Sequence, residues 1–361
     1  MKFRWSIFHL ILFSEFSDIL FQALLVISST DKFDKVHRNP SLLNCLNISF
    51  SNIHYPTDAT LHYETLLNAT SRFRNLAFPF LGKHLGIENQ FIMKYVNKPL
   101  SFFNGFIPIF IQFVDIEFND WTTKYPEFPK LRDVKWTLKK ILRTDVVYLI
   151  LSQNDHGVHF LQNNFPNILT LSGGGYGHVP IPLLGYERQY IPATNTLPFP
   201  FDIGFSGSFK TSKSRGHMVH RLSDILPQYN MTFRFSNSGF HGSNYLEFIA
   251  NTTFNLAPRG IGRTSFRLSE IIQIGRIPVY VHHDDPWIPY NGSDVDYHSI
   301  GYMSHFDDLD ELVQRLSKIS ISEIQSKLEK IKAARVYYTY EGFFEEIDEF
   351  IRDPMGPTGN T

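Results

Sequence analysis

Short apolar runs separated by amphipathic segments recur along the first half of this chain. The apolar runs lie at 107–115, 145–151 and 167–171, and apolar residues at helical spacing fill 131–143. Runs that are apolar throughout, rather than alternating, are typical of strands buried on both faces of a parallel sheet. The pattern predicts an α/β domain.

The second half repeats the alternation of strands and helices. A Pro- and Thr-rich stretch at 185–201 precedes it and is predicted to be a linker. The predicted strands are 202–209, 232–236, 254–257 and 277–281, and the predicted helices are 214–226, 243–250, 307–316 and a long region from 320 to about 351. We therefore predict two α/β domains.

These patterns divide the chain into five parts. They are a signal-anchor or amphipathic helix at 1–30, a first α/β domain at 31–195, a second α/β domain at 196–336, a C-terminal helix at 337–352 and a disordered tail at 353–361. The roles of the two domains depend on the motifs described next.

The segment 254–275 predicts a strand, a glycine-rich loop and a helix in succession. Pro258 has no N–H to give to a central strand, so the strand ends there. Gly260 and a second glycine two residues later permit a tight turn and close approach to a ligand. Thr264 or Ser265 can cap the following helix, and the glycine at the end of the segment is a plausible C-terminal stop.

Arginines and one carboxylate accompany this loop. Arg263, Arg267 and Glu270 are four and three residues apart, so on one helix they would share a face, which we expect to be solvated. A helix N-terminus with glycine amides, these arginines and Arg259 suits a diphosphate, and a carboxylate one turn further suits ribose hydroxyls. The alternative is a solvated ion pair after an ordinary turn.

The same residues resemble the signature of exostosin-like glycosyltransferases. The resemblance is specific over about residues 200–300, fades toward both ends, and departs from the family at Arg276, where a small residue is common. It lies in the stretches 257–260, 263–268 with Glu270, 275–279 and the acidic-aromatic-proline run 284–290.

This resemblance implies a fold and an activity. The fold is α/β and GT-B-like, with two Rossmann-like domains facing a central cleft. The activity is inverting transfer of a sugar from a nucleotide sugar, UDP-linked by expectation, to a glycan or glycoprotein hydroxyl. The first domain would bind the acceptor, and the second domain would bind the donor through Gly207, Arg215, Arg259, Gly260, Arg263, Ser265, Arg267 and Glu270.

Two of those residues belong to a second strand-to-helix element. Gly207 follows an apolar strand, and Arg215 lies shortly after it in a basic segment. The resemblance implies that this arginine lies near the donor phosphates. A solvated basic loop is the alternative.

Loops after two predicted strands of the first half carry the candidate catalytic bases. Asp155 and His156 follow one strand, and His178 follows the next, after a triple glycine. A carboxylate or an imidazole can take the proton of an attacking hydroxyl. We predict Asp155 or His178 as the base. The alternatives are an Asx turn for Asp155 and a backbone-bonded loop histidine for His178.

Composition narrows the classes of partner. The net charge is −1 and 43% of residues are hydrophobic, which is typical of a globular protein and excludes a strongly basic nucleic-acid binder. The single cysteine excludes an internal disulfide framework. No Walker motif or early dinucleotide fingerprint is present, so the sequence does not support an NTPase or a Rossmann dehydrogenase.

Metal-binding residue types occur, but their pattern is poor for a metal site. In 282–285 neighbouring side chains alternate between faces of a strand, and 294–296 follows a turn. We therefore expect no metal and no cofactor beyond the nucleotide sugar, with arginines supplying the positive charge.

The N-terminus leaves the location open. Lys2 and Arg4 precede a short apolar run, but Glu15 and Asp18 interrupt it before the roughly 20 residues that a membrane span requires. A signal-anchor, typical of the family, predicts a Golgi or other secretory-pathway membrane. An amphipathic helix predicts a cytoplasmic protein.

Two rival functions remain on the sequence alone. One is a non-catalytic carbohydrate- or nucleotide-binding protein on the same scaffold, which would retain the donor motif without a base. The other is a sugar-nucleotide hydrolase or phosphorylase, which acceptor-dependent turnover would distinguish from a transferase.

Overall fold

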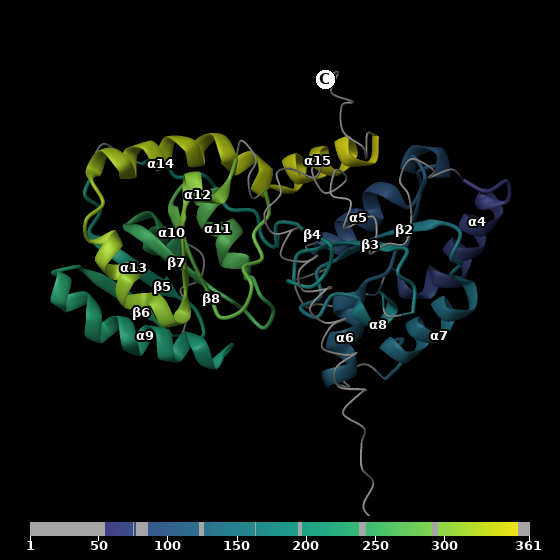
Figure 1. The fold of residues 1–361 in the computed structure, drawn as a ribbon, viewed down its shortest axis with the longest axis horizontal. Coiled ribbons are helices and arrows are strands. Elements are labelled where there is room, and N and C mark those ends of the chain that lie inside the picture. Colours follow the sequence, from purple (N-terminus) through teal and green to yellow (C-terminus); the bar gives the residue numbers. More distant parts are fainter. Residues whose placement is uncertain are drawn as a thin grey trace, which may run out of the picture.

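The structure, a computed structural model, describes residues 55–74, 76, 86–122, 126–162, 164–193, 197–237, 243–290 and 295–352. These residues form two lobes side by side, each with a central sheet (Figure 1). The predicted N-terminal segment 1–30 and tail 353–361 lie outside the described residues. Among those that are described, no helix is both long and apolar enough to cross a membrane.

The first lobe contains a four-stranded parallel sheet in the order β1-β2-β3-β4. Its strands are β1 Phe106–Pro108, β2 Val147–Ser152, β3 Ile168–Ser172 and β4 Val179–Pro180. Its helices are α4 Ala59–Thr70, η2 Ser71–Phe73, α5 Ile87–Tyr95, η3 Leu100–Phe103, α6 Phe113–Thr122, α7 Leu131–Ile141 and α8 His159–Gln162.

The second lobe contains a five-stranded parallel sheet in the order β6-β5-β7-β8-β9. Its strands are β5 Phe201–Ser206, β6 Phe233–Ser236, β7 Thr252–Pro258, β8 Ile277–His282 and β9 Tyr302–His305. Its helices are α9 Lys213–Ile225, η4 Leu226–Tyr229, α10 Ser243–Ala250, α11 Phe266–Ile274, α12 Tyr297–Ile300, η5 Phe306–Asp308, α13 Leu309–Leu316, α14 Ile321–Ala334 and η6 Arg335–Tyr338. The predicted α/β class with two parallel-sheet domains is confirmed.

The strand order of the second sheet reverses between β5 and β7. The chain runs from β5 outward to β6, then returns to β7 on the other side and continues to β9. In open parallel sheets, ligands bind beyond the carboxyl ends of the strands at such a reversal. The loops that follow β5 and β7 therefore lie at the favoured ligand position of this lobe.

The strand, loop and helix predicted at 254–275 are confirmed. β7 ends at Pro258, and α11 begins after Ser265 in the N-cap position. Gly275 ends α11 with φ of 89°, and its N–H donates to the carbonyls of Ile271 and Ile272. A left-handed residue here favours glycine, as the C-terminal stop requires.

The predicted strand 107–115 is wrong beyond its first residues. The strand β1 ends at Pro108, and α6 begins at Phe113. Glu88 accepts a hydrogen bond from the Val114 N–H at 3.0 Å, which satisfies a free donor in the first turn of that helix. An apolar run alone does not distinguish a buried strand from the start of a buried helix.

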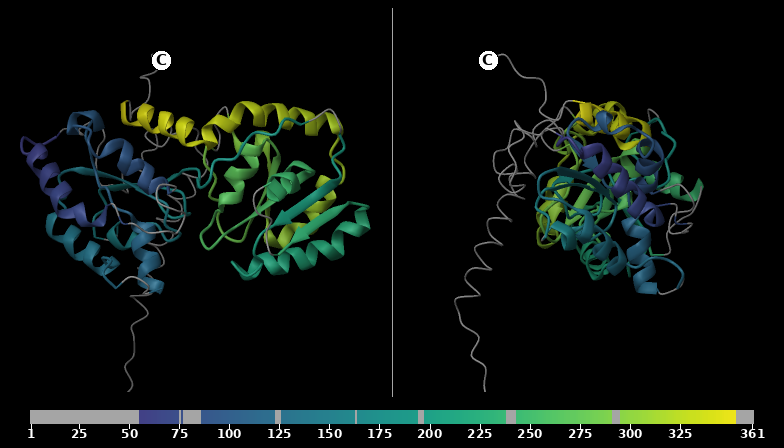
Figure 2. Two further views of the ribbon diagram at one scale, coloured as in Figure 1. Left: turned by 180° about the vertical axis from the view of Figure 1, so that it is seen from behind. Right: turned by 90° about the vertical axis from the view of Figure 1, so that its right-hand side faces the viewer.

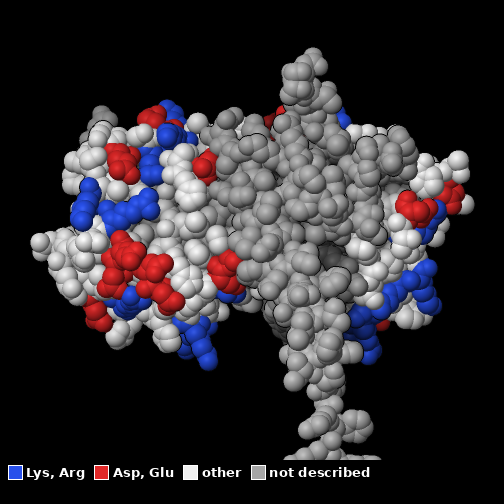
Figure 3. Space-filling view, in the orientation of Figure 1, with Lys and Arg blue, Asp and Glu red and all other residues white. Residues whose placement is uncertain are grey.

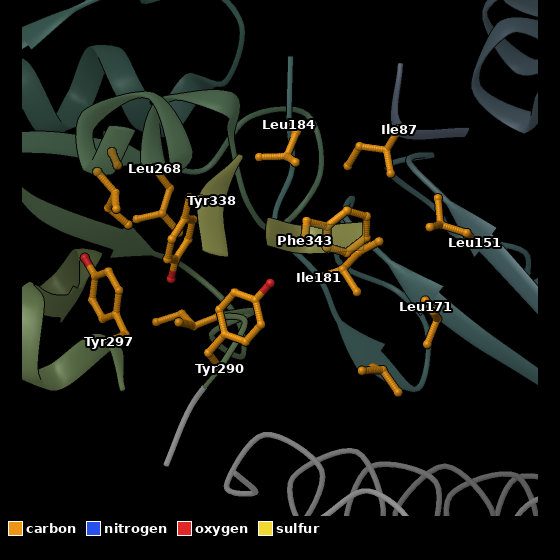
Figure 4. Packing of buried hydrophobic residues seen from close by; sticks show 14 of the residues in the cluster. Ile87, Leu151, Leu171, Ile181, Leu184, Leu268, Tyr290, Tyr297, Tyr338 and Phe343 are labelled. Atoms are coloured by element: carbon orange, nitrogen blue, oxygen red, sulfur yellow. The ribbon is translucent and has the colours of Figure 1, made fainter. Parts of the chain in front are cut away.

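The last helix, α15 at Tyr340–Arg352, returns to the first lobe (Figures 1 and 2). The Tyr95 hydroxyl donates to Asp348 at 2.6 Å, and the Phe106 and Phe350 rings stack with centroids 5.7 Å apart. Phe343 of α15 lies between apolar residues of the two lobes in Figure 4. This helix therefore joins the two lobes through apolar packing.

A buried carboxyl group fixes the loop after β2. Glu88 is 1% exposed and accepts hydrogen bonds from the N–H groups of Val114 and Gln153. Burial raises its pKa to about 8, although these two hydrogen bonds act in the opposite direction. Because Gln153 begins the loop that carries Asp155, Glu88 helps to position a candidate catalytic residue.

This burial predicts a pH-dependent stability. The folded pKa of Glu88, about 8, exceeds its ordinary value of 4.5, so unfolding releases a proton between these values and the free energy of unfolding falls as pH rises. Urea unfolding at several pH values should show a shallower fall in Glu88→Gln. Glu247→Gln, on an exposed residue, is the control and should keep the wild-type slope; equal slopes in all three proteins would contradict the prediction.

Candidate functional site

Arg215 joins the two loops at the strand-order reversal. It is 6% exposed, and its guanidinium donates to the carbonyls of Ser208, Pro258 and Arg259. Burial, and secondarily the charge of Arg267, lower its pKa to about 10, so it remains a cation at neutral pH. The structure thus places a buried positive charge between the loops, although backbone carbonyls already accept its hydrogen bonds.

The first turn of α11 contains polar groups without partners. Ser265 is in the N-cap position, yet its buried hydroxyl makes no hydrogen bond within the part of the chain that the structure describes. Arg267 donates from Nη1 to the Tyr245 hydroxyl at 2.8 Å, but its buried Nε is unpaired within the same described ranges. Buried donors without acceptors are costly, and a bound anion would satisfy them.

Gly207 provides the space that the Arg267 guanidinium occupies. A Cβ at Gly207, where φ is 158°, would lie 2.4 Å from Nη2 of Arg267. The guanidinium carbons of Arg215 and Arg267 also lie 5.6 and 5.5 Å from the centroid of the Phe205 ring. The structure therefore brings Gly207, Arg215 and Arg267 together, as the donor-site prediction requires.

A cavity of about 350 Å³ opens beside this group. Its walls come from the start of α9, the loop after β7 and the end of β8. They consist of Thr211, Ser212, Lys213, Ser214, Arg259, Gly260, Ile261 and His283. Ser212 is the N-cap residue of α9 and, like Ser265 of α11, makes no side-chain capping bond. Ser212 lines the cavity, and Ser265 lies behind its wall, since a Cβ at Gly260 would lie 3.8 Å from the Ser265 Cβ.

The predicted position of Arg263 on a solvated helix face is wrong. Residue 263 precedes the helix, which begins at Phe266, and only 9% of its surface is exposed. Its guanidinium lies 4.4 Å from the centroid of the Tyr176 ring, and its nitrogens approach the carboxylates of Asp284 and Asp285 within 3.7 and 3.6 Å. Arg263 therefore points toward the first lobe.

The expectation that Glu270 is solvated is also wrong. Glu270 is 9% exposed and accepts from Arg188 Nε at 3.0 Å and from the Tyr245 hydroxyl at 2.8 Å. Because Tyr245 also accepts from Arg267, the four side chains form one connected network. A ribose would have to share Glu270 with these two donors.

Loops from the two sheets meet through backbone groups. The Gly262 N–H donates to Oδ1 of Asp155 at 2.9 Å, and the Arg263 N–H donates to the Gly174 carbonyl at 3.0 Å. The Trp287 indole donates to the Ser172 carbonyl at 2.9 Å. The loop predicted to bind the donor thus contacts the loop that carries a candidate base.

The two candidate bases differ in surroundings. Burial raises the pKa of Asp155 to about 6, close to neutral pH, which suits a general base. Burial lowers the pKa of His178 to about 4. The Nδ1 atom of His178 accepts from the Thr170 N–H at 3.0 Å, as expected for a backbone-bonded loop histidine. The geometry favours Asp155.

The acidic residues near the site pair with arginines. Arg259 donates from Nη1 to Asp284 at 2.9 Å. Asp296, from the second acidic pair considered for metal, accepts from the His298 N–H and begins α12. Within the described residues, no group of three or more His, Cys, Asp and Glu side chains is placed to hold a metal ion.

Sequence reasoning missed several residues of this region. Arg188 lies in the predicted linker, and Tyr245 lies in α10, 25 residues before its partner Glu270. Asp284 was considered for metal and as part of the resembling run 284–290, but not as a partner of Arg259 and Arg263, which it contacts. The one sequence signal was that residues 254–270 contain three arginines and a single acidic residue, which indicates that acidic partners come from elsewhere in the chain.

Comparison with known proteins gives a partial likeness of shape. No family model and no curated protein matches the chain. It is similar to the GtfA/B complex, with a TM-score of 0.37 and 11% identity over 61% of this chain and 48% of that one. It is also similar to TarM, with a TM-score of 0.36 and 10% identity over 62% of this chain and 47% of that one. A third similar structure is an alpha-glucosyltransferase in complex with UDP and a 13-mer DNA, with a TM-score of 0.33 and 11% identity over 61% of this chain and 75% of that one. The chain spans about half the length of the first two. Likeness at this level assigns no activity.

The buried Nε of Arg267, which has no hydrogen-bond partner in the described chain, predicts that this residue contributes to the affinity for a nucleoside diphosphate. Arg267→Ala should weaken UDP binding by about 1.5–3 kcal/mol, because a charge-assisted contact is lost. Arg263→Ala should weaken it less, since Arg263 is already paired with Asp284 and Asp285. Calorimetric titration with UDP measures both.

Arg221→Ala is the matched control, because Arg221 forms a surface ion pair with Asp310 on the same lobe. It should bind UDP as the wild type does. Thermal melts should accompany the titrations, since Arg267 also bonds Tyr245. A folded Arg267→Ala variant with unchanged UDP affinity would remove this arginine from the site.

Proposed function

We propose that this protein is a glycosyltransferase that uses a nucleotide sugar, UDP-linked by expectation, and transfers the sugar to a glycan or glycoprotein hydroxyl. The observation that carries the proposal is the unpaired, buried pair of Ser265 Oγ and Arg267 Nε at the strand-order reversal of the second sheet. Both are donors, and both lie where a helix N-terminus adds positive potential.

A diphosphate fits this arrangement better than a single small anion. The cavity continues from Gly260 toward Ser212 and the start of α9, so the positive region covers more than one anionic group. Arg215 and Arg267 are cations here, and no carboxylate of the described chain forms an ion pair with either. Glu270 lies one turn further along α11 than Arg267, and we assign it to the ribose attached to the diphosphate.

The reaction needs a base opposite the donor. In the proposed mechanism the Asp155 carboxylate takes the proton of the acceptor hydroxyl as its oxygen attacks the anomeric carbon. The bond from that carbon to the diphosphate oxygen breaks with inversion. The leaving diphosphate keeps the electron pair, and the arginines and helix N-termini stabilise its charge. The contact of Asp155 with Gly262 brings base and donor loop together.

The exostosin-like subtype is part of the proposal. Its support is the resemblance of 257–260, 263–268 and 275–279 to that family's signature. Arg276, where the chain departs from the family, is buried and donates to the carbonyls of Ala250 and Ile191, away from the loop after β7. The departure therefore leaves the donor region unchanged. Secretory-pathway membrane anchoring through the N-terminus is proposed on the same resemblance.

The rival function is a non-catalytic carbohydrate- or nucleotide-binding protein. It would use the same anion site and would need no base. The raised pKa of Asp155 and its place against the donor loop favour the enzyme, because a carboxyl group whose pKa lies near neutral pH is suited to take a proton from an acceptor hydroxyl.

A donor screen tests the proposal directly. Release of nucleoside diphosphate is measured from a panel of UDP- and GDP-sugars, with and without mixed glycan acceptors. We expect release from a UDP-sugar that increases several-fold with acceptor. If the rate of nucleoside diphosphate release is the same with and without acceptor, the protein is a hydrolase. If the nucleotide sugar binds but no nucleoside diphosphate is released, the protein is the non-catalytic binding protein.

Metal independence is a second prediction. Arginines and helix N-termini supply the charge stabilisation in this proposal, so turnover should persist in excess chelator. The same release assay, run in EDTA and after adding back Mg²⁺ or Mn²⁺, checks it. If chelation abolishes turnover and a divalent ion restores it, the account of charge stabilisation is wrong, and Asp284 and Asp285 become the residues to test.

The base is tested by Asp155→Asn. This variant keeps an oxygen that can accept from Gly262 and loses the proton acceptor, so kcat should fall by roughly 10²–10⁴-fold with little change in UDP affinity. The wild-type kcat/KM should fall as pH drops below about 6, because Asp155 becomes protonated.

His178→Ala provides the comparison. Because Nδ1 of His178 accepts from the Thr170 backbone, this variant should lose some stability and retain most of its kcat. Near-normal kcat in Asp155→Asn, with loss in His178→Ala, would transfer the role to the imidazole. Steady-state kinetics of both variants beside UDP titration separate the two outcomes.

A further inference from the structure

Two exposed aromatic rings flank the turn that carries Asp155. We propose that Trp121, His156 and Tyr176 form the binding surface for an uncharged saccharide, which identifies the acceptor class as neutral glycan rather than an anionic chain. The proposal rests on the proposed function for the saccharide's role as acceptor. The surface itself, here called the aromatic strip, is argued from the geometry of these three side chains.

Trp121 forms one end of the aromatic strip. It lies in the last turn of α6 and is 55% exposed. Its ring meets the His156 ring edge-on, with centroids 5.9 Å apart and planes at 74°. The His156 ring is oriented in turn by Glu117, whose Oε1 lies 3.1 Å from Nδ1. An indole that is fixed at one edge and open on its surface provides a flat platform.

Tyr176 forms the other end. It is 37% exposed and follows the triple glycine after β3. Gly157 lies directly against it, because a Cβ on Gly157 would lie 2.0 Å from the Tyr176 carbonyl oxygen. The guanidinium of Arg263 lies over the Tyr176 ring at 4.4 Å. The aromatic strip therefore runs from α6, across the turn at 155–157, to the donor loop.

The chemistry of the aromatic strip selects a sugar. The face of an aromatic ring is electron-rich, and it attracts the weakly positive C–H groups on the apolar face of a pyranose. The Glu117 carboxylate and the His156 imidazole lie beside Trp121, where they can bond ring hydroxyls. A few polar groups around an aromatic platform are what orient a small ligand.

The charge around Trp121 disfavours an anionic chain. The helix α6 carries the partly exposed carboxylates of Glu117 and Asp120 and no lysine or arginine, while its third acidic residue, Asp115, is buried. On the face drawn in Figure 3, both lobes carry Lys and Arg as well as Asp and Glu where the surface is coloured. A uronic acid or a sulfate would meet like charge at the Trp121 end, so a neutral saccharide is preferred.

The position of the aromatic strip gives it a role in transfer. Asp155 lies in the same turn as His156 and contacts Gly262 of the donor loop. A sugar that stacks on Trp121 and extends toward Tyr176, whose ring Arg263 covers on one face, would thus place hydroxyls near the candidate base. These two rings act by positioning the acceptor, so their loss should appear in acceptor KM more than in UDP affinity.

The chain offers a matched control tryptophan. Trp136 lies in α7 of the same lobe and is 61% exposed. Its ring is covered by the Lys140 ammonium, whose Nζ lies 3.3 Å from the ring centroid. Trp136→Ala therefore removes an exposed indole of similar exposure without changing the aromatic strip.

The experiment measures saccharide binding to the full chain without donor. The probes are the neutral trisaccharides maltotriose, cellotriose and chitotriose, with trigalacturonate as the anionic counterpart, followed by saturation-transfer NMR and intrinsic fluorescence. We expect a neutral probe to bind, Trp121→Ala to weaken it about tenfold or more, and Trp121→Phe and Trp136→Ala to change it by less than about threefold.

The outcomes separate this proposal from the donor assignment. Absence of binding by every neutral probe, preference for trigalacturonate, or equal loss in Trp121→Ala and Trp136→Ala would each overturn the aromatic strip. UDP titration of the same samples reports on the donor site independently. Neutral-probe binding that depends on Trp121, in a protein that does not bind UDP, would support the aromatic strip and remove the transferase proposal.

Discussion

The contact between two glycine loops is the constraint on which the site depends. A Cβ at Gly262 would lie 2.1 Å from the Gly174 carbonyl oxygen, and a Cβ at Gly175 would lie 2.5 Å from the Cβ of Arg263. Only residues without side chains allow the loops of the two sheets to approach this closely. The hydrogen bonds from Gly262 to Asp155 and from Arg263 to Gly174 exist because of that approach.

The arginines near this contact differ in whether a carboxylate already balances their positive charge. Arg259 and Arg263, near the glycine loops, are paired with Asp284 and Asp285, so their positive charge is already balanced. Arg267, further into the second lobe, donates to Tyr245 and forms no ion pair with a carboxylate of the described chain; its buried Nε, like that of Arg263, has no hydrogen-bond acceptor there. An incoming diphosphate would therefore gain most from Arg267 and from the Ser265 hydroxyl, and less from the arginines that the sequence places first.

The sequence predicted what depends on local pattern. Local patterns predicted β2, β3 and the strands β5 to β8 of the second sheet, although not β9, and Gly275 predicted the end of α11. It failed where distant partners decide the structure. Glu88 accepts a hydrogen bond from the first turn of α6, which begins inside an apolar run. Arg188 pairs with Glu270, 82 residues away in the sequence. The donor-site residues could be named from their motif, but their burial, their partners and the orientation of Arg263 could not.

Because the network around Glu270 is buried, a substitution in it is expected to affect stability as well as ligand affinity. Tyr245 donates to Glu270 and accepts from Arg267, so one hydroxyl couples a carboxylate proposed for the ribose to an arginine proposed for the diphosphate. Removing any member leaves a buried polar partner unsatisfied, which lowers stability as well as affinity. The same coupling holds Arg267 beside Gly207 before any ligand binds. Preorganisation of this kind reduces the ordering that the donor would otherwise have to impose, so the network serves binding through the fold itself.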